Sequence, residues 1–180
     1  MASLHPLQDS PPVLPTIESG AALQFVTIDI HGHSHALPIE AVIEFRMWIE
    51  PTPLPHSPYH LLGIINIRGE IVPVFDVGAR LGYGRAQPTA QHVITLVQIP
   101  GDKVVGLLVN DVSDVLTVTE ISSLPSCDAG LSTPVVDSVI EIGDTVLGII
   151  NVDVLCNSET PDELLAFKHP AFPPPRHDAF

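Results

Sequence analysis

Short runs of alternating apolar and polar residues dominate the middle of this chain. Residues 25–30 alternate with period two, and residues 36–39 resume the apolar run after the polar segment HGHSH at 31–35. Such alternation places one face of a strand in a core, and a glycine-containing polar break supplies a turn. The pattern therefore predicts an antiparallel hairpin over residues 25–39.

The same criteria predict further strands and one short helix. The strands cover residues 61–67, 71–75, 92–99, 104–109 and 114–118, and a final hairpin covers 136–152 with its turn at Gly143-Asp144. Segment 40–48 fits neither a strand nor a helix cleanly, so both remain open. Asp76 followed by Gly82 predicts one or two helical turns between a capping carboxylate and a closing glycine. About nine or ten short strands with little helix indicate a barrel or sandwich.

A weak internal repeat runs through the strand-rich region. Residues 39–45 resemble residues 109–115 at an offset of 70 (109 − 39), and the run GEIV at 69 resembles GDTV at 143 at an offset of 74 (143 − 69). Two matches at nearly the same offset predict two similar β-subdomains. Chance similarity among valine-rich strands is the alternative.

The ends of the chain differ in composition from its middle. Residues 1–20 are rich in proline and serine, which predicts a flexible N-terminal arm. The main domain then covers residues 21–156. In the tail, 157–180, the run DELLAFKH favours a short helix, and three consecutive prolines at 173–175 prevent its continuation.

Composition narrows the classes of function. The 180 residues include 21 acidic and 7 basic side chains, so the net charge is -14, and such a surface repels nucleic acid and anionic lipid. Aromatic residues make up 5%, which leaves an aliphatic core rich in strand formers. No stretch approaches the roughly 18 apolar residues of a membrane span, and the N-terminus lacks the features of a signal peptide. These features predict a cytoplasmic protein, in which Cys127 and Cys156 stay reduced.

We find no motif for nucleophilic, phosphate-binding or metal-dependent catalysis, and we expect neither an enzyme nor a cofactor. His31, His33 and His35 form the best metal candidate, since alternate strand residues share a face. Gly32 and the turn interrupt that geometry, so we expect an exposed, metal-free turn. The remaining candidates are acidic residues that we interpret as a solvated surface: Asp111, Asp114, Glu120, Glu141 and Asp144.

The predicted hairpin at residues 62–76 carries the most specific motif. Its sequence is LGIINIRGEIVPVFD, with Pro55 upstream, and it resembles the small-G-x-x-N-x-R-G-x-x-x-P-x-x-D run of the CheW-type chemotaxis coupling proteins. Residues 39–45 (IEAVIEF) and 105–116 (VGLLVNDVSDVL) resemble two further segments of that family. The resemblance covers roughly residues 22–156. The chain departs from the family at the histidine-rich turn, at Ile67 and over residues 122–138.

The resemblance implies a mostly β fold of two intertwined five-stranded SH3-like β-barrel subdomains with a few short helices. It implies a non-catalytic adaptor that links a chemoreceptor signalling tip to a CheA-type histidine kinase, at membrane-bound receptor arrays. The receptor-facing groove would include Val42, Glu44 and Arg68, and kinase contacts would use exposed strands and turns of the first barrel. The alternatives are a coupling protein of a related pathway, such as pilus motility, and a small β-barrel metal-binding protein that uses the HGHSH turn.

The residues of the hairpin suggest how it could work. The Asn66 side chain can bond nearby backbone, and Gly69 permits the positive φ that a tight turn requires. Pro73 lacks an N–H and suits an edge or bulge. Arg68 at the turn either pairs with a partner's carboxylate or bonds internally and fixes the two subdomains together.

Overall fold

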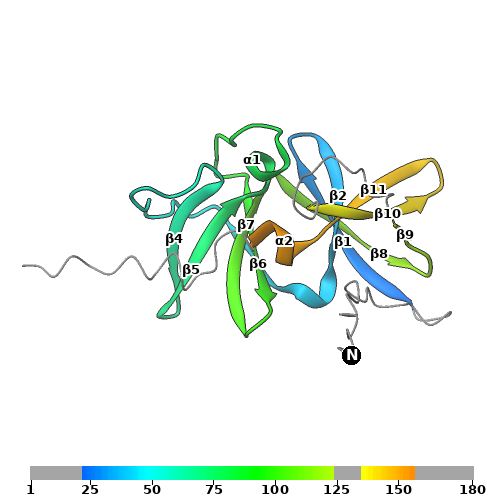
Figure 1. The fold of residues 1–180 in the computed structure, drawn as a ribbon, viewed down its shortest axis with the longest axis horizontal. Helices are drawn as coiled ribbons and strands as arrows, with labels where there is room; N and C mark the ends of the chain where they lie inside the picture. The colour runs from blue at the N-terminus through cyan, green and yellow to red at the C-terminus, as the bar shows by residue number, and fades with distance from the viewer. Residues whose placement is uncertain (1–21, 124–134, 157–180) are drawn as a thin grey trace, which may run out of the picture.

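The computed structural model describes residues 22–123 and 135–156, and Figure 1 shows that they form two barrels side by side. The strands are β1 (Leu23–Ile30), β2 (His33–Pro38), β3 (Val42–Met47), β4 (Leu61–Ile67), β5 (Glu70–Asp76), β6 (Val93–Ile99), β7 (Lys103–Val109), β8 (Asp111–Val118), β9 (Ser122–Ser123), β10 (Val136–Ile142) and β11 (Thr145–Ile150). The helices are the 3-10 helix η1 (Ile39–Ala41), α1 (Val77–Leu81) and α2 (Val152–Cys156). The arm and tail expected at 1–20 and 157–180 lie outside the described residues, as does Cys127.

The strands form two sheets of equivalent topology. Barrel A has the order β8-β1-β2-β11-β10-β9, and barrel B has the order β3-β6-β7-β5-β4. In each barrel an antiparallel hairpin, β1–β2 or β6–β7, pairs in parallel with a strand of a second hairpin, β10–β11 or β4–β5. The two-residue β9 extends one edge of barrel A. Both barrels are therefore SH3-like subdomains with five principal strands each, as the resemblance implied.

The two barrels exchange strands along the chain. The order β1-β2-β3-β4-β5-α1 repeats as β6-β7-β8-β10-β11-α2. Barrel A combines the first hairpin with strands of the second half, and barrel B combines β3, β4 and β5 with the hairpin of the second half. This exchange makes the subdomains intertwined and explains why similar segments recur at offsets near 70.

The apolar core consists of three clusters of buried side chains. One fills barrel A around Ile140, and another fills barrel B around Ile94. The third lies between the barrels and takes residues from both, including Ile28, Leu107 and Leu155. Leu155 belongs to α2, which sits between the two sheets in Figure 1. Because the hairpins β1–β2 and β6–β7 contact two clusters each, burial on both faces fixes their register.

Segment 40–48, which the sequence left open, is a strand preceded by one 3-10 turn. Its strand β3 is an edge strand of barrel B, and exposed and half-buried residues alternate along it. Pro73 lies in β5 at the residue before the pairing with β7 begins at Val74. The missing N–H of Pro73 therefore interrupts no pair of the parallel β5–β7 ladder.

The prediction of an exposed turn at residues 31–35 is wrong in part. The turn itself is His31-Gly32, with φ of 52° and 81°, and β2 begins at His33. His35 is buried, with 6% of its surface exposed. The local sequence does not reveal this burial, because the residues that cover β2 are distant in the chain.

The predicted helix at Asp76–Gly82 is confirmed as α1. The Asp76 carboxylate caps it, since Oδ1 accepts a hydrogen bond from the Ala79 N–H at 3.0 Å. Its other oxygen, Oδ2, accepts from the Ala86 N–H at 2.7 Å, beyond the helix. Gly82 closes the helix in the left-handed conformation. One buried carboxylate thus fixes both α1 and the loop that follows it.

We expect Asp76→Asn to lower the free energy of unfolding by about 2 kcal/mol, because an amide NH₂ would face one of the two N–H donors. Urea denaturation of the variant measures the loss. Asp114→Asn, at an exposed position of β8, is the matched control and should change stability by less than about 0.5 kcal/mol. Equal losses in the two variants would contradict the clamp role of Asp76.

Within residues 22–123 and 135–156, no helix has the length and apolar character needed to cross a bilayer.

Candidate functional site

The turn between β4 and β5 is a two-residue loop, Arg68-Gly69. Both residues have positive φ, 54° and 90°, as in a type I′ hairpin turn. Asn66 Oδ1 accepts a hydrogen bond from the Gly69 N–H at 2.9 Å and so ties the strand end to the turn. Arginine is rarely found with positive φ, since its Cβ then crowds the following carbonyl. The fixed turn holds the Arg68 side chain at the tip of the hairpin.

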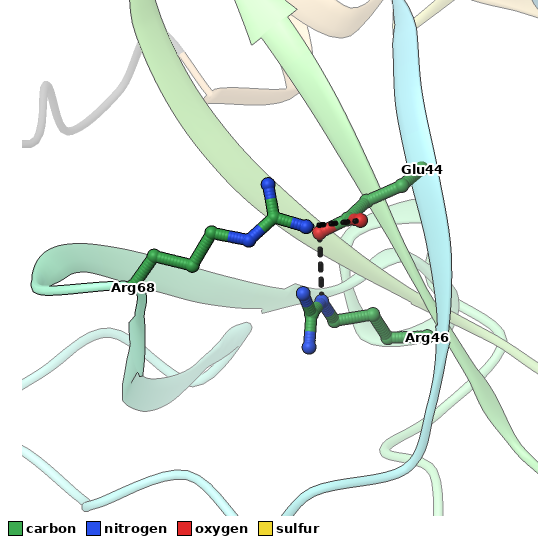
Figure 2. A network of polar contacts seen from close by, with 3 residues as sticks. All are labelled: Glu44, Arg46 and Arg68. Carbon is green, nitrogen blue, oxygen red and sulfur yellow. Dashed lines mark hydrogen bonds and ion pairs between the residues drawn. The ribbon is translucent and has the colours of Figure 1, made fainter.

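Arg68 belongs to a network of three charged side chains, which Figure 2 shows. Arg46 Nε donates to Glu44 Oε1 at 2.7 Å, and Arg68 Nη2 lies 3.7 Å from Glu44 Oε2. Glu44 and Arg46 come from β3, while Arg68 follows β4. These strands are the two ends of the barrel B sheet. The network therefore joins the sheet's two ends within one barrel and does not fix the two subdomains together.

The two ion pairs of Glu44 differ in strength. The Arg46 contact has hydrogen-bond length, whereas the Arg68 contact is a longer ion pair. The side chain of Arg68 is 80% exposed, against 30% for Glu44. An exposed pair of this kind contributes little to stability. The guanidinium of Arg68 is thus oriented toward Glu44 while most of its surface stays accessible.

Val42 does not join this network. The β3–β6 register pairs Val42 with Val97 and Glu44 with Leu96, so a bulge lies between Val42 and Glu44. Val97 and Leu96 are neighbours on a strand and point to opposite faces, and their partners therefore do so too. Val42 packs against the cluster between the barrels. Of the three residues expected in the groove, the structure brings together Glu44 and Arg68 only.

The bulge also reveals two side chains that the sequence reasoning missed. Phe45 pairs with Thr95 and Met47 with Val93, on the same face as Val42 and Val97. Phe45 and Met47 are exposed, Met47 by 75%. Edge strand β3 thus has an apolar face, which we call the β3 apolar strip (Val42, Phe45, Met47), and a charged face with Glu44 and Arg46. The sequence shows that these residues are apolar, but it does not show the bulge that places them on one face of β3.

The charges of the described residues are unevenly divided between the barrels. Every lysine and arginine of residues 22–123 and 135–156 belongs to barrel B or to its connections: Arg46, Arg68, Arg80, Arg85 and Lys103. The acidic residues expected to form a solvated surface are all exposed, on or next to strands of barrel A: Asp111, Asp114, Glu120, Glu141 and Asp144. Barrel B is therefore the part of the described structure best suited to an anionic partner.

The described part of the chain contains no cluster of metal-ligating or reactive side chains. No group of three histidine, cysteine or acidic side chains there has an arrangement that could hold a metal ion. Burial raises the pKa of the Cys156 thiol to about 12, so it stays protonated and unreactive near neutral pH. The site is a charged and apolar surface suited to binding.

Comparisons with known proteins agree with this architecture. Residues 24–160 match the family model of the CheW-like domain. The "Probable chemotaxis protein CheW" of Rhizobium etli is 39% identical over 142 residues, covering 78% of this chain and 90% of that protein. The crystal structure of the scaffolding protein TtCheW from Thermoanaerobacter tengcongensis superimposes with a TM-score of 0.68 and 28% identity, covering 75% of this chain and 92% of that one.

A CheA protein is also among the relatives. The "Chemotaxis protein CheA" of Cereibacter sphaeroides is 27% identical over 99 residues, which cover 52% of this chain and 14% of that protein. The fold of this chain is a double SH3-like barrel. The chain belongs to the CheW-like domain family.

Proposed function

We propose that this chain is a non-catalytic coupling protein of chemotaxis, which binds a chemoreceptor signalling tip and a CheA-type histidine kinase together. The observation that carries the proposal is the match of residues 24–160 to the CheW-like domain, together with the ion-paired arginine at the tip of its most specific hairpin. We further propose that it acts in the cytoplasm, at receptor arrays, and that residues 21–156 are the coupling unit.

The kinase side of the proposal is supported by a shared domain. Part of a CheA protein aligns with about half of this chain, so a kinase of that type contains a region of similar sequence. Two related double barrels can associate through equivalent strands and turns in a pseudo-symmetric contact. We propose that this chain contributes exposed strands and turns of barrel A, the barrel that holds the first hairpin.

The receptor side uses Val42, Glu44 and Arg68. Because Val42 and Glu44 point to opposite faces of β3, we propose that the receptor tip contacts the edge of this strand and touches both faces. The β3 apolar strip would supply buried apolar area, and Arg68 would bind a carboxylate of the receptor. The internal pair with Glu44 points the Arg68 guanidinium toward β3, and most of its surface remains accessible to a partner.

Co-sedimentation tests the proposal. Purified chain is mixed with receptor-containing membranes and a CheA-type kinase from the same organism, and the pellets are assayed for both proteins. We expect the chain to sediment with receptor membranes at micromolar concentration and to increase the amount of kinase in the pellet. Membranes without receptor are the control. Binding of neither partner at these concentrations would refute the coupling role.

A further inference from the structure

The β3 apolar strip lies on an open edge of barrel B. β3 ends the strand order of this barrel, so among the described strands it pairs with β6 alone. Phe45 and Met47 are exposed, and so is Ile49, two residues further along the chain. An edge strand with a row of exposed apolar side chains tends to associate with other chains unless a segment covers it. A cover would therefore stabilise the strip whenever no partner is bound.

The C-terminal tail leaves the described structure on the side of this strip. α2 ends at Cys156, which is buried in the cluster between the barrels, and Val42 of the strip packs against the same cluster. Figure 1 shows α2 beside β6 and β7, whose residues share this cluster, and β6 is the strand that pairs with β3. Residues 157–160 span at most about 14 Å when extended. The residues after them are thus tethered near barrel B.

The tail sequence after this linker has the pattern of a short amphipathic helix. Thr160 and Glu163 match the two partners of a capping box, and Pro161 stands at the first helical position. Three large apolar residues then share one helix face: Leu164, Leu165 and Phe167. Pro170 ends the pattern. The sequence therefore predicts a helix over 161–169, beyond the described residues, with an apolar face that needs a surface to bind.

Charge favours barrel B over barrel A as that surface. Residues 159–169 hold three acidic side chains and one lysine. Barrel A also has exposed apolar residues, but they lie beside acidic residues of the same strands or turn: Val115, Ile142 and Val146. The edge of β3 instead carries Arg46, and Arg68 lies across from it on the β4–β5 turn. An acidic segment is therefore attracted to the edge of β3 and repelled by barrel A.

We propose that tail residues 161–169 form a helix that lies on the β3 apolar strip and covers it in the free chain. The nine-residue helix is about 13 Å long and the strip about 16 Å, so the two match in length. Leu164 and Phe167, one turn apart, pack on Phe45 and Met47. A short linker gives the segment an effective concentration near the millimolar range, so a weak contact suffices. A receptor must then displace the tail, a consequence that rests on the proposed receptor site.

A second copy of the chain is the competing occupant, and electrostatics disfavours it. Two strips in contact would bring together the Arg46 and Arg68 side chains of both copies. Each chain also has a net charge of -14, so two copies repel each other at long range. The tethered tail avoids both costs.

Oxidation of Met47 by hydrogen peroxide tests the cover. Met47 is one of two methionines in the chain, the other being Met1, and the rate of thioether oxidation follows exposure. Mass spectrometry of the peptide that contains Met47 gives the rate in the full-length chain. We expect the double variant Leu164→Ser/Phe167→Ser to oxidise about fivefold faster than wild type. Phe180→Ser, which removes an aromatic residue of the same tail beyond the helix, is the matched control and should keep the wild-type rate.

Two outcomes with these variants contradict the cover. Equal rates in wild type and the double variant would show that the tail leaves the strip open. An equal acceleration in Phe180→Ser would remove the assignment to residues 161–169. The wild-type rate is also measured at chain concentrations of about 1 and about 100 μM. A rate independent of concentration supports a tethered segment, whereas protection that grows with concentration would assign the cover to a second copy and overturn the proposal.

Receptor binding tests the competition separately. In co-sedimentation with receptor membranes, the double variant should bind about fivefold more tightly than wild type, because its strip is open in every molecule. Equal affinities would overturn the competition. If neither chain bound receptor, the proposed coupling role would fail, while the Met47 rates would still decide whether the tail covers the strip.

Discussion

Gly63→Ala is expected to lower the free energy of unfolding by at least about 3 kcal/mol. Gly63 has φ of 145°, a conformation that side chains other than glycine's rarely adopt. A Cβ would overlap the Thr52 carbonyl oxygen and come within 2.7 Å of its carbon. These are backbone atoms held by two hydrogen bonds between Thr52 and Ile64, of 2.8 and 2.9 Å. Neither atom can move without breaking the bridge that ties the loop before β4 to barrel B.

Gly143→Ala is the matched control for this prediction. Gly143 also has positive φ, 58°, but nothing lies within 4 Å of the position of its Cβ. Its substitution adds backbone strain alone, of about 1 kcal/mol. Urea denaturation of both variants separates strain from overlap. Losses of equal size would show that the loop at Thr52 yields easily and would contradict the rigid bridge.

Local chemistry explains which parts of the fold could be predicted. The capping carboxylate Asp76 and the closing Gly82 bracket α1, because both signals act on neighbouring backbone. The alternation of apolar and polar residues likewise predicted the two hairpins whose turns contain Gly32 and Gly143. The segment at 40–48 was ambiguous because the bulge between Val42 and Glu44 breaks its period of two.

Contacts between distant segments explain what could not be predicted. His35 was expected in an exposed turn, but its partner Tyr83 is 48 residues away in sequence and belongs to the other barrel. The same holds for the site. The link from Asn66 to Gly69 spans three residues and is readable from the turn chemistry. The ion pair of Arg68 with Glu44 depends on how the two ends of the barrel B sheet meet, which no local pattern encodes.

Arg68→Glu is expected to weaken receptor binding at least tenfold while leaving kinase binding unchanged. The substitution removes the exposed guanidinium and places a carboxylate beside Glu44 and in front of an anionic partner. The folded chain should lose less than about 1 kcal/mol, since the pair it breaks is exposed and 3.7 Å long. Co-sedimentation with receptor membranes, a kinase pull-down and the melting temperature are measured on one preparation.

Arg85→Glu supplies the matched control, because Arg85 is an exposed cation of the same barrel that lies over the Tyr59 ring at 5.5 Å. It changes the net charge of the chain by the same amount as Arg68→Glu, so a general electrostatic effect would weaken receptor binding equally in both. A loss confined to Arg68→Glu assigns the contact to the hairpin tip. Loss of both partners together with a lower melting temperature would instead assign Arg68 an internal role in barrel B.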